Sequence, residues 1–518
     1  MRSLQSIFQK SLYQNLLFVL VFGAVAWFYN YQEILTYRPT SMHQWRNCVS
    51  ASMALNYAHE GDFFHPRTHN LQADEMQSDI SVTEFPVFYY LIGMLYRVFG
   101  FHEIIYRLMH LLIGFAGLFF LYRTGIRMFG HVAYALTLPL LVFSSPIYVY
   151  YLNNFIPDAP SLSIVLIAFY FFYRFYGKGK GADLAIAMLF FALAGLIKPP
   201  AFLLYFAILG VLILEWIFGA RMRSDRKIFQ YPIKQLVMML GPLILALGWF
   251  TYARIYTDTH GGIVSEVELR PIWILSRETI QNTWASIVLK FQNGQYHSPA
   301  FLLLSGLLFI FVLIRWKKQN QMMRWLVILT FLGGVSFSLL FYRSLRNHDY
   351  YQMNNLVIPV LVFVTSLLYM KDQHQRIFRS WISHLVILVF VLFTIISCQS
   401  LLHSHYYGGW HEWNARERYN KPYNDITPYL RSLGINRDDK VYCTPDPSIN
   451  ISLYLMDQKG FTDFFRKNQA FSEKVELFAG HGLQYVIIGK DADPDVNPGD
   501  AGLIWIGEHK GAKIYRLE

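Results

Sequence analysis

The sequence predicts a polytopic α-helical membrane protein with about 11 transmembrane helices and a small C-terminal α/β domain. Hydrophobic residues make up 54% of the 518 residues and charged residues only 15%, whereas soluble proteins carry about 25% charged residues. Long apolar runs recur from Leu12 to Leu402, and runs of this kind are typical of membrane spans. After Ser400 the composition becomes that of a soluble protein.

Eleven apolar segments are predicted to cross the membrane. The first follows Arg2 and Lys10 and lacks a small-residue cleavage site, so we expect it to stay in place as a signal anchor. The expected spans are 12–30, 104–122, 131–150, 159–176, 183–197, 200–218, 233–254, 298–315, 324–342, 354–370 and 380–402.

The apolar stretch from Phe85 to Phe99 decides the topology. About 13 apolar residues are too few to cross a ~30 Å hydrocarbon core, so we expect an interfacial helix. The basic loops after the later spans then all fall on one side, which the positive-inside rule assigns to the cytoplasm. These loops carry Arg123, Arg127, Lys178, Lys180, Arg315, Lys317, Lys318, Lys371, Arg376 and Arg379.

The net charge of +11 is explained by the same loops. Basic residues beside apolar spans serve membrane topology and contact anionic lipid head groups. We therefore expect membrane lipids as partners and no nucleic acid.

With a cytoplasmic N-terminus, eleven spans place the C-terminus outside. The first external loop, 31–103, then shares the outer side with 153–160, the surroundings of Lys198, 255–297, 343–352 and everything after His403. Acids and aromatic residues collect in these segments, so the active face is expected there. The predicted domains are a transmembrane domain, 1–403, and an extracytoplasmic α/β domain, 404–518.

Within 404–518, short β-branched and aromatic runs predict strands at KVYC, QYVIIG, LIWIG and AKIYRL. Segments 446–457 and 470–480 are predicted to be helical. Alternating strands and helices indicate a small α/β domain.

Two acids stand out at the expected outer ends of helices. Asp158 follows a proline at the start of a span, where it could be an N-cap that satisfies backbone N–H groups, a functional carboxylate at the outer membrane surface, or both. Glu84 precedes Pro86 at the start of the interfacial helix, where an acid also suits the helix dipole. Lys198, before two prolines, could bind an anion or extend to lipid head groups.

A compact polar group, His43-Gln44-Trp45-Arg46, begins a segment predicted to be an amphipathic helix, 42–59. The imidazole of His43 could act as a general base, and Arg46 could bind a phosphate with both guanidinium nitrogens. Trp45 could equally be an interfacial anchor.

One short external loop, FYRSLRNHDYYQMNN, is unusually rich in cations and aromatic residues. Its density exceeds what membrane anchoring requires, and it suits an anionic head group such as a phosphate. The candidates are Arg343, Arg346, His348, Tyr350 and Tyr351.

In this order, the segments resemble the GT-C superfamily of glycosyltransferases. The nearest likeness is to the protein O-mannosyltransferase and aminoarabinose lipid A transferase family (glycosyltransferase family 39-like). The resemblance covers nearly the whole chain and rests on organisation. TEFPVFYYLIGMLYRVFG matches the family's Glu-Lys-Pro-Pro stretch, with Glu84 and Pro86 kept and Phe85 in place of the lysine. Asp158 matches the second-loop Asp, and His348 to Tyr351 match the late loop.

The resemblance implies transfer of a sugar from a polyprenyl-phosphate carrier to a lipid, glycan or protein acceptor, with inversion. It implies a bacterial cytoplasmic (inner) membrane location with the active face and C-terminal domain periplasmic. Asp158, Glu84 and His43 are then the candidate catalytic residues, because His43-Gln44 occupies the place of the family's acidic pair. Arg46, Lys198, Arg343, Arg346, His348, Tyr350 and Tyr351 are the candidate donor-phosphate residues.

No cofactor is certain, although clustered external carboxylates could bind a divalent cation. Two other classes stay open: a scaffold that binds polyprenyl-phosphate sugar without transferring it, and a flippase. A flippase would carry ionisable residues near the middle of the membrane.

Overall fold

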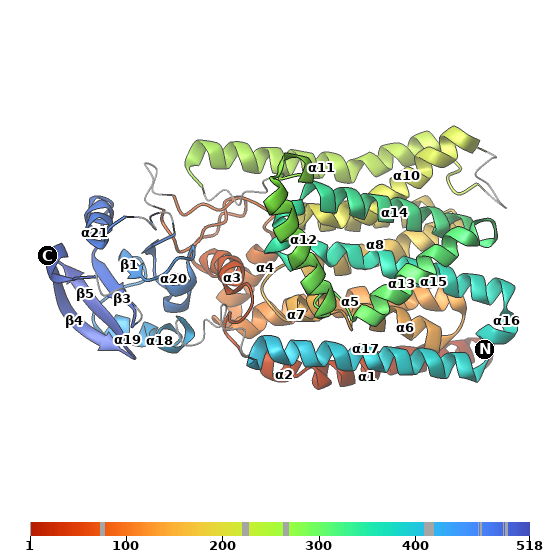
Figure 1. Cartoon of the computed structure of the whole chain (residues 1–518), viewed down its shortest axis with the longest axis horizontal. Coiled ribbons are helices and arrows are strands. Elements are labelled where there is room, and N and C mark those ends of the chain that lie inside the picture. Colours follow the sequence, from red (N-terminus) through yellow and green to blue (C-terminus); the bar gives the residue numbers. More distant parts are fainter. Residues whose placement is uncertain are drawn as a thin grey trace.

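The computed structural model describes residues 2–72, 78–219, 227–262, 269–408, 419–464, 466, 469–490, 492 and 496–518. Long helices lie side by side along the longest axis, and a small α/β domain caps one end of this bundle (Figure 1). The N-terminus lies at the opposite end. The structure therefore confirms the predicted fold class.

Every predicted span coincides with helix. The bundle helices are α1 (Arg2–Phe28), α5 (Glu103–Phe129), α6 (Val132–Val142), α7 (Pro146–Leu152), α8 (Asp158–Lys178), α9 (Gly181–Ile197), α10 (Phe202–Phe218), α11 (Pro232–His260), α13 (Pro299–Ile314), α14 (Gln321–Leu340), α15 (Val357–Gln373) and α17 (Trp381–Tyr407). In the described part of the chain, seven helices are long and apolar enough to cross a membrane, or eight if a bent pair is one span. The count of eleven crossings stays a prediction.

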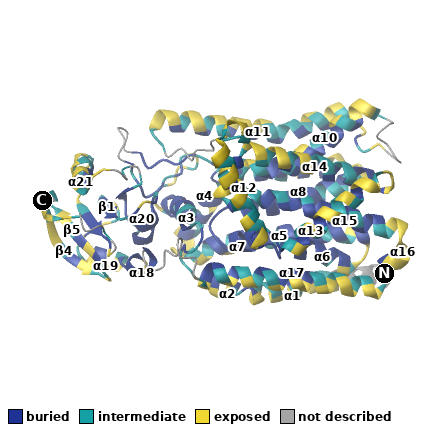
Figure 2. Cartoon of the chain, in the orientation of Figure 1, coloured by how far each residue is buried: buried dark blue, intermediate teal, exposed yellow. Residues whose placement is uncertain are grey.

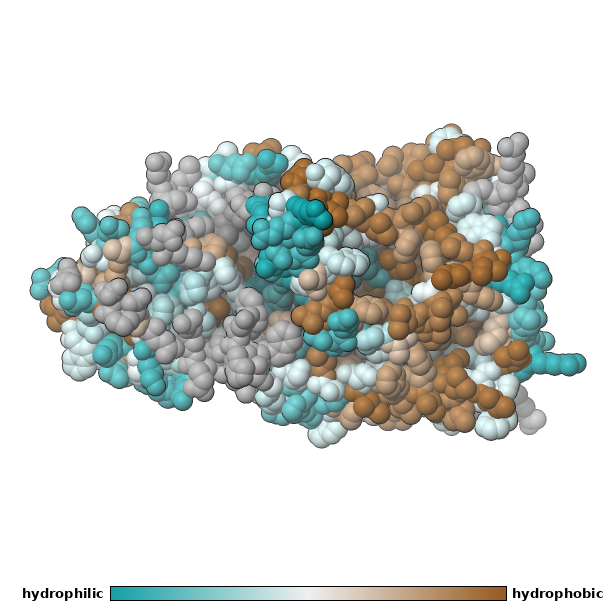
Figure 3. Space-filling view, in the orientation of Figure 1, coloured by the Kyte–Doolittle hydropathy of each residue, from teal (hydrophilic) through white to brown (hydrophobic). Residues whose placement is uncertain are grey.

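Hydrophobic side chains cover the flank of the bundle between two more hydrophilic ends (Figure 3). Large apolar residues such as Leu112, Ile314 and Trp381 are more than 70% exposed on it. A soluble protein would leave no contiguous apolar surface of this size, so the flank is a lipid-contacting surface. The protein is thus a multi-pass membrane protein.

The predicted span 131–150 is not one straight helix. It is α6 followed by α7, with a bend of 75° between them. Pro146 begins α7, because a proline is accommodated in the first helical turn but not in a continuous helix. α7 is buried on all sides, and it places the Tyr151 hydroxyl against Asp349.

Short helices join the bundle helices at their ends. At the end with the C-terminal domain they are α2 (Tyr31–Ile34), η1 (Pro199–Ala201), η3 (Ile272–Ile274), α12 (Arg277–Gln292), η5 (Tyr342–Arg346) and η6 (Asp349–Leu356). At the other end they are η4 (Trp316–Lys318) and α16 (Gln375–Phe378). The basic loops predicted for the cytoplasm therefore lie opposite the C-terminal domain.

Two further helices, α3 (Gln44–His59) and α4 (Val87–Phe99), lie where the bundle meets the C-terminal domain (Figure 1). α4 buries one face and exposes Val98 and Phe99 on the other, as expected for an interfacial helix. α3 confirms the helix predicted at 42–59, but its predicted amphipathic character is wrong, because α3 is buried almost all round (Figure 2). The C-terminal domain covers the face that the sequence pattern left polar.

The C-terminal domain contains a five-stranded sheet in the order β2-β1-β3-β5-β4. Its strands are β1 (Val441–Thr444), β2 (Gly460–Thr462), β3 (Tyr485–Ile488), β4 (Leu503–His509) and β5 (Ala512–Leu517), and its helices α18 (Lys421–Tyr423), α19 (Thr427–Ser432), α20 (Ile451–Met456), α21 (Phe471–Gly480) and η8 (Gly499–Ala501). β2, β1 and β3 are parallel, and β5 pairs antiparallel with β3 and β4. The four predicted strands are present, and β2 is an additional one.

The first external loop completes the edge of this sheet. The N–H of Gly460 donates to the carbonyl of His69 at 3.0 Å, and the N–H of Leu71 donates to the carbonyl of Gly460 at 2.8 Å. Added backbone pairing of this kind removes the open edge that β2 would otherwise present. The C-terminal domain is therefore joined to the transmembrane domain through residues far apart in sequence.

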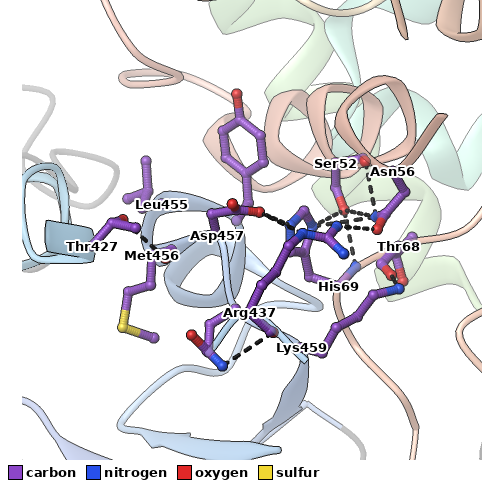
Figure 4. Close-up of polar contacts among 12 residues, drawn as sticks. Ser52, Asn56, Thr68, His69, Thr427, Arg437, Leu455, Met456, Asp457 and Lys459 are labelled. Carbon is purple, nitrogen blue, oxygen red and sulfur yellow. Dashed lines mark hydrogen bonds and ion pairs between the residues drawn. The ribbon is translucent and has the colours of Figure 1, made fainter. Parts of the chain in front are cut away.

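A buried polar network strengthens the same junction (Figure 4). Arg437 donates to Asn56 on α3 at 2.6 Å and to Asp457 at 3.0 Å, and Asp457 lies 3.1 Å from His69. Lys459 forms an ion pair of 2.7 Å with Asp79. The contacts fix α3 against the C-terminal domain, and with it the candidate residues His43, just before α3, and Arg46, in its first turn.

Candidate active site

Six segments bring their polar side chains together at the end of the bundle that carries the C-terminal domain. They are the residue before α3 and its first turn, the coil before α4, the first residue of α8, the residue after α9, α7 and η6. The side chains that converge are His43, Arg46, Glu84, Tyr151, Asp158, Lys198, His348, Asp349, Tyr350 and Tyr351. Most of the predicted site residues therefore lie in one place.

Glu84 lies at the centre of the cationic half of this cluster. One carboxylate oxygen accepts from Arg46 and from the Tyr89 hydroxyl, the latter at 2.5 Å, and Lys198 lies 3.9 Å away. The other oxygen accepts from Thr83 at 2.9 Å. Burial alone would raise the pKa of Glu84, but the charges of Arg46 and Lys198 outweigh it and hold the pKa well below its usual range. Glu84 is therefore an ionised, fully engaged carboxylate.

Asp158 pairs with Lys198. Its Oδ2 lies 3.2 Å from the ammonium nitrogen, and the Asp158 side chain is 5% exposed. The N-cap interpretation is wrong: Pro157 occupies the N-cap position, no side chain caps the helix, and Asp158 is the first residue of α8. Its oxygen nevertheless benefits from the free N–H groups of that helix end. Lys198 follows α9 in an extended conformation, which turns it toward the acids.

His43 and Asp349 form a second acid–base contact on the opposite side of the cluster. His43 Nε2 lies 3.3 Å from Asp349 Oδ1. The same oxygen accepts from the Tyr151 hydroxyl at 2.6 Å, and Oδ2 accepts from Gln295 at 2.7 Å. Asp349 is 1% exposed, so this carboxylate is buried and held on both oxygens.

The loop that carries Asp349 forms an aromatic wall beside His43. The ring of Tyr350 lies edge-on to His43 with centroids 5.1 Å apart, and its hydroxyl is 3.0 Å from His348 Nδ1. The Tyr351 ring stacks on Tyr350 at 5.3 Å. Burial lowers the pKa of His348 to about 4, so this imidazole is neutral at neutral pH. It can contact a phosphate as an N–H donor but not as a charge.

Arg343 and Arg346 are not brought into the cluster. Both side chains are exposed on η5, while the backbone carbonyls of Leu345 and Arg346 accept from Lys290 of α12 at 2.9 and 2.7 Å. The cation-rich loop therefore divides: its first half faces outward, and its second half lines the site. A one-dimensional pattern cannot show this division, because it follows from the turn between η5 and η6.

An apolar groove of about 320 Å³ begins beside the site and runs between α10 and α14. Pro199 and Pro200, directly after Lys198, line its near end with Asn354 and Asn355. Further lining residues are Leu203, Phe206, Ala207, Leu329, Phe337 and Leu340. The Phe337 ring stacks on Tyr351 at 6.4 Å, so the groove and the polar cluster are adjacent.

Sequence reasoning missed four residues that hold the cluster in place. Tyr89 and Thr83 bond Glu84, and Tyr151 and Gln295 bond Asp349. Tyr89 follows Glu84 by five residues, so a search for donors one helical turn downstream of an acid could have found it. Tyr151 and Gln295 have no such signal, because their partner is distant in sequence.

A second constellation, Ser52–His69–Asp457, has the order of a nucleophile, base and acid (Figure 4). Ser52 Oγ lies 2.6 Å from His69 Nδ1, and His69 Nε2 lies 3.1 Å from Asp457. Ser52 and His69 are fully buried between the domains, and Ser52 also accepts from the His69 N–H. No substrate reaches them, so these residues are part of the domain junction.

No three His, Cys, Asp or Glu side chains among the described residues lie close enough together to bind a metal ion. Glu84 and Asp158 are each paired with a cationic side chain. The divalent cation stays a prediction to which the structure assigns no residues.

Comparison with known protein families finds one that is similar in sequence to part of this chain. Residues 83–252 match the family described as dolichyl-phosphate-mannose-protein mannosyltransferase, and these residues include Glu84, Asp158 and Lys198. No curated protein sequence gives a significant match.

The structure is similar to ArnT from Cupriavidus metallidurans, solved in the apo state and bound to undecaprenyl phosphate. The apo comparison has a TM-score of 0.57 at 14% identity and covers 98% of both chains, and the lipid-bound one has the same TM-score at 13% identity over 97% of both. Arabinofuranosyltransferase AftD from mycobacteria matches with a TM-score of 0.53 at 11% identity, over 96% of this chain and 40% of that one. The oligosaccharyltransferase AglB from Archaeoglobus fulgidus, in complex with an inhibitory peptide and a dolichol-phosphate, matches with a TM-score of 0.53 at 11% identity, over 88% of this chain and 66% of that one. The chain therefore has the fold of the GT-C glycosyltransferases, and residues 83–252, from the coil before α4 into α11, are similar in sequence to the dolichyl-phosphate-mannose-protein mannosyltransferase family.

Proposed function

We propose that the chain is an integral-membrane glycosyltransferase that moves a sugar from a polyprenyl-phosphate carrier to an acceptor at the outer membrane surface. The observation that carries this proposal is the placement of two half-buried cations, Arg46 and Lys198, beside an apolar groove that begins at Pro199. An amphiphile with an anionic head and an aliphatic tail suits this combination. Relatives of the same fold were solved with undecaprenyl phosphate and dolichol-phosphate.

Arg46 and Lys198 would bind the phosphate and stabilise the charge that develops as it leaves. Their counter-ions, Glu84 and Asp158, fix the two cations before substrate arrives, which is the preorganisation that electrostatic catalysis requires. His348 and the hydroxyls of Tyr350 and Tyr351 would add neutral donors. The exposed Arg343 and Arg346 would contact lipid head groups nearby.

In the proposed reaction, an acceptor hydroxyl or amine attacks the anomeric carbon from the face opposite the phosphate. The new bond forms as the bond between that carbon and the phosphate oxygen breaks, and the electron pair leaves with the phosphate. A single displacement inverts the anomeric centre. A general base removes the acceptor proton, and Asp158, Glu84 and His43 are its candidates.

The site would face the periplasm in the cytoplasmic membrane of a bacterium. The basic loops lie at the end of the bundle opposite the site, and the positive-inside rule puts such loops in the cytoplasm. The C-terminal domain would be periplasmic and could hold the acceptor against the site.

The test is transfer by the purified full chain in proteoliposomes. The donors would be radiolabelled undecaprenyl phosphoryl mannose and arabinose, and the acceptors would be total envelope lipid, glycan and protein fractions. We expect the unmodified chain to produce a labelled acceptor and Asp158→Asn to lose at least ~100-fold in rate. Binding of undecaprenyl phosphate without transfer by the unmodified chain would contradict the enzyme and favour a lipid-binding scaffold.

A further inference from the structure

The structure separates the three candidate bases by what each already contacts. Glu84 receives hydrogen bonds on both oxygens and faces two cations. Asp158 faces the ammonium of Lys198, which the proposed mechanism uses for the phosphate. Glu84, held on both oxygens by cationic and hydroxyl donors, is a weak proton acceptor. Protonation of Asp158 would remove the negative charge that faces Lys198, so this acid is suited to holding the ammonium in place.

His43 has the opposite environment. Its Nε2 contacts the carboxylate of Asp349 at 3.3 Å, and a carboxylate at one ring nitrogen both orients an imidazole and stabilises its protonated form. Asp349 is fixed in turn by Tyr151 and Gln295. Tyr151 and Gln295 thus hold Asp349 in place, and Asp349 in turn orients His43, as in other acid–imidazole pairs.

The backbone at His43 lies in the left-handed region. His43 comes immediately before α3 with φ 57°, and Ser41, two residues earlier, has a positive φ as well. Histidine adopts this region more readily than most non-glycine residues, and here the surrounding structure holds it there. This conformation turns the imidazole back toward Asp349, and Arg46 follows one helical turn later on the same side of α3.

We propose that His43 and Asp349 form the general-base pair of the transferase, with His43 as the catalytic base and Asp349 as its positioning residue. This inference rests on the proposed function and assigns Asp349 a role in it. It also accounts for His43-Gln44 at the place where the similar family has two acids. The base is then an imidazole supported from η6 instead of a carboxylate on the first loop.

The proton balance of the step is complete. In the proposed step the proton of the resting imidazole is on Nε2, which faces Asp349 Oδ1 at 3.3 Å, and the accepting lone pair is on Nδ1. As the acceptor oxygen or nitrogen bonds to the anomeric carbon, its proton moves to Nδ1. The imidazolium is stabilised by Asp349, and the polyprenyl phosphate leaves toward Arg46 and Lys198. The proton returns to solvent before the next turnover.

The groups that face His43 come from several elements. Asp349, His348 and Tyr350 face it from η6 and the residue before it, Tyr151 from α7 and His405 from α17. Lys290 of α12 acts on Asp349 from farther away. Asp349 is the carboxylate in direct contact with His43 in the described part of the chain.

The experiment compares His43→Asn, Asp349→Asn and His59→Asn in the proteoliposome transfer assay. Asn tolerates the left-handed conformation, so His43→Asn removes the base without opposing the backbone. His59→Asn makes the same change at the exposed far end of α3 and is the matched control. We expect kcat to fall at least ~100-fold in His43→Asn, with donor KM and affinity for undecaprenyl phosphate within about twofold.

Asp349→Asn provides a readout that a merely structural role would not move. Loss of the carboxylate destabilises the imidazolium, so the acid limb of the kcat profile should shift to lower pH while the maximum falls at least ~10-fold. In His43→Gly, which also suits the positive φ, added imidazole should restore part of kcat.

The outcomes separate the two proposals. Normal kcat in His43→Asn overturns the base pair, leaves the transferase standing and returns the role to Asp158. An unshifted acid limb in Asp349→Asn overturns the positioning role. No transfer by the unmodified chain, with undecaprenyl phosphate still bound, overturns the proposed function and this inference with it.

Discussion

At the scale of single residues, the ion pair of Arg46 and Glu84 stabilises two charges that are largely removed from water. Glu84 is 8% exposed and donors reach both of its oxygens. Glu84→Gln leaves the Arg46 charge half-buried without its partner. We expect the free energy of unfolding to fall by about 2–4 kcal/mol, because breaking a buried pair costs more than the pair contributes. Thermal unfolding in detergent measures the change.

The double variant Arg46→Gln with Glu84→Gln is the control for this prediction. It removes both charges, so we expect it to be more stable than Glu84→Gln alone while transfer stays abolished. Equal destabilisation in the single and double variants would contradict the ion-pair explanation.

His69 provides a pH-dependent prediction at the domain junction. Burial lowers its pKa to about 4, although the contact with Asp457 acts in the opposite direction. Between pH ~6.5, where an unfolded histidine titrates, and about pH 4 the unfolded chain binds more protons than the folded one. Stability should therefore fall as the pH is lowered through this window, by up to roughly 1.4 kcal/mol per pH unit for this group.

The measurement is the melting temperature in detergent from pH 7.5 to 4.5. His69→Asn should be less stable at pH 7.5 and should show a smaller decrease toward acid pH. His102→Asn, at an exposed position outside the network, should keep the decrease of the unmodified chain. The same decrease in His69→Asn would exclude His69 as a source of the acid sensitivity.

At the scale of helices and strands, the sequence predicted where most elements lie along the chain but not which elements pack against one another. Apolar length placed all bundle helices, since membrane spans require long uninterrupted apolar runs. The sequence pattern did not predict the bend between α6 and α7, because Ser144-Ser145-Pro146 lies within an apolar run. Strand β2 was not predicted, because its three residues, Gly460–Thr462, are too few to show an alternating pattern. The burial of α3 depends on a domain almost 400 residues later in the chain.

The groove between α10 and α14 allows a prediction about the donor tail. Ser336 lines it beside Phe337 and Gly333. Ser336→Trp would fill much of the ~320 Å³ with a rigid ring, so the first isoprene units could no longer lie there. We expect donor KM to rise at least ~10-fold for the undecaprenyl donor. The lost contacts bind the ground state and the transition state equally, so kcat should change little.

A donor with a two-isoprene tail is the matched comparison, since it reaches less far into the groove. Its KM should rise less than that of the undecaprenyl donor in Ser336→Trp. An equal rise for both donors would place the tail elsewhere. Leu332→Trp on the same helix, at an exposed position outside the groove-lining set, is the control for general damage to α14.

At the scale of the whole molecule, the sequence identified most residues of the candidate site but not how they pair with one another. Glu84, Asp158 and Lys198 were singled out from their positions at helix ends, and they do lie together. Which cation pairs with which acid depends on the packing of α3 against α4 and of α8 against α9. The division of the cation-rich loop, with Arg343 exposed and Asp349 buried, depends on tertiary packing as well.

The orientation of the molecule can be tested with two single cysteines at opposite ends. Lys318 is exposed in η4 at the end with the basic loops, and Lys513 is exposed on β5 of the C-terminal domain. The native Cys48, Cys398 and Cys443 are buried, so they should contribute little background. In cells with a permeabilised outer membrane, a membrane-impermeant maleimide should label Lys513→Cys and label Lys318→Cys only after lysis. The positive-inside rule requires this result if the site faces the periplasm. The reverse pattern would put the site in the cytoplasm, where the acceptors of the proposed reaction would have to be cytoplasmic.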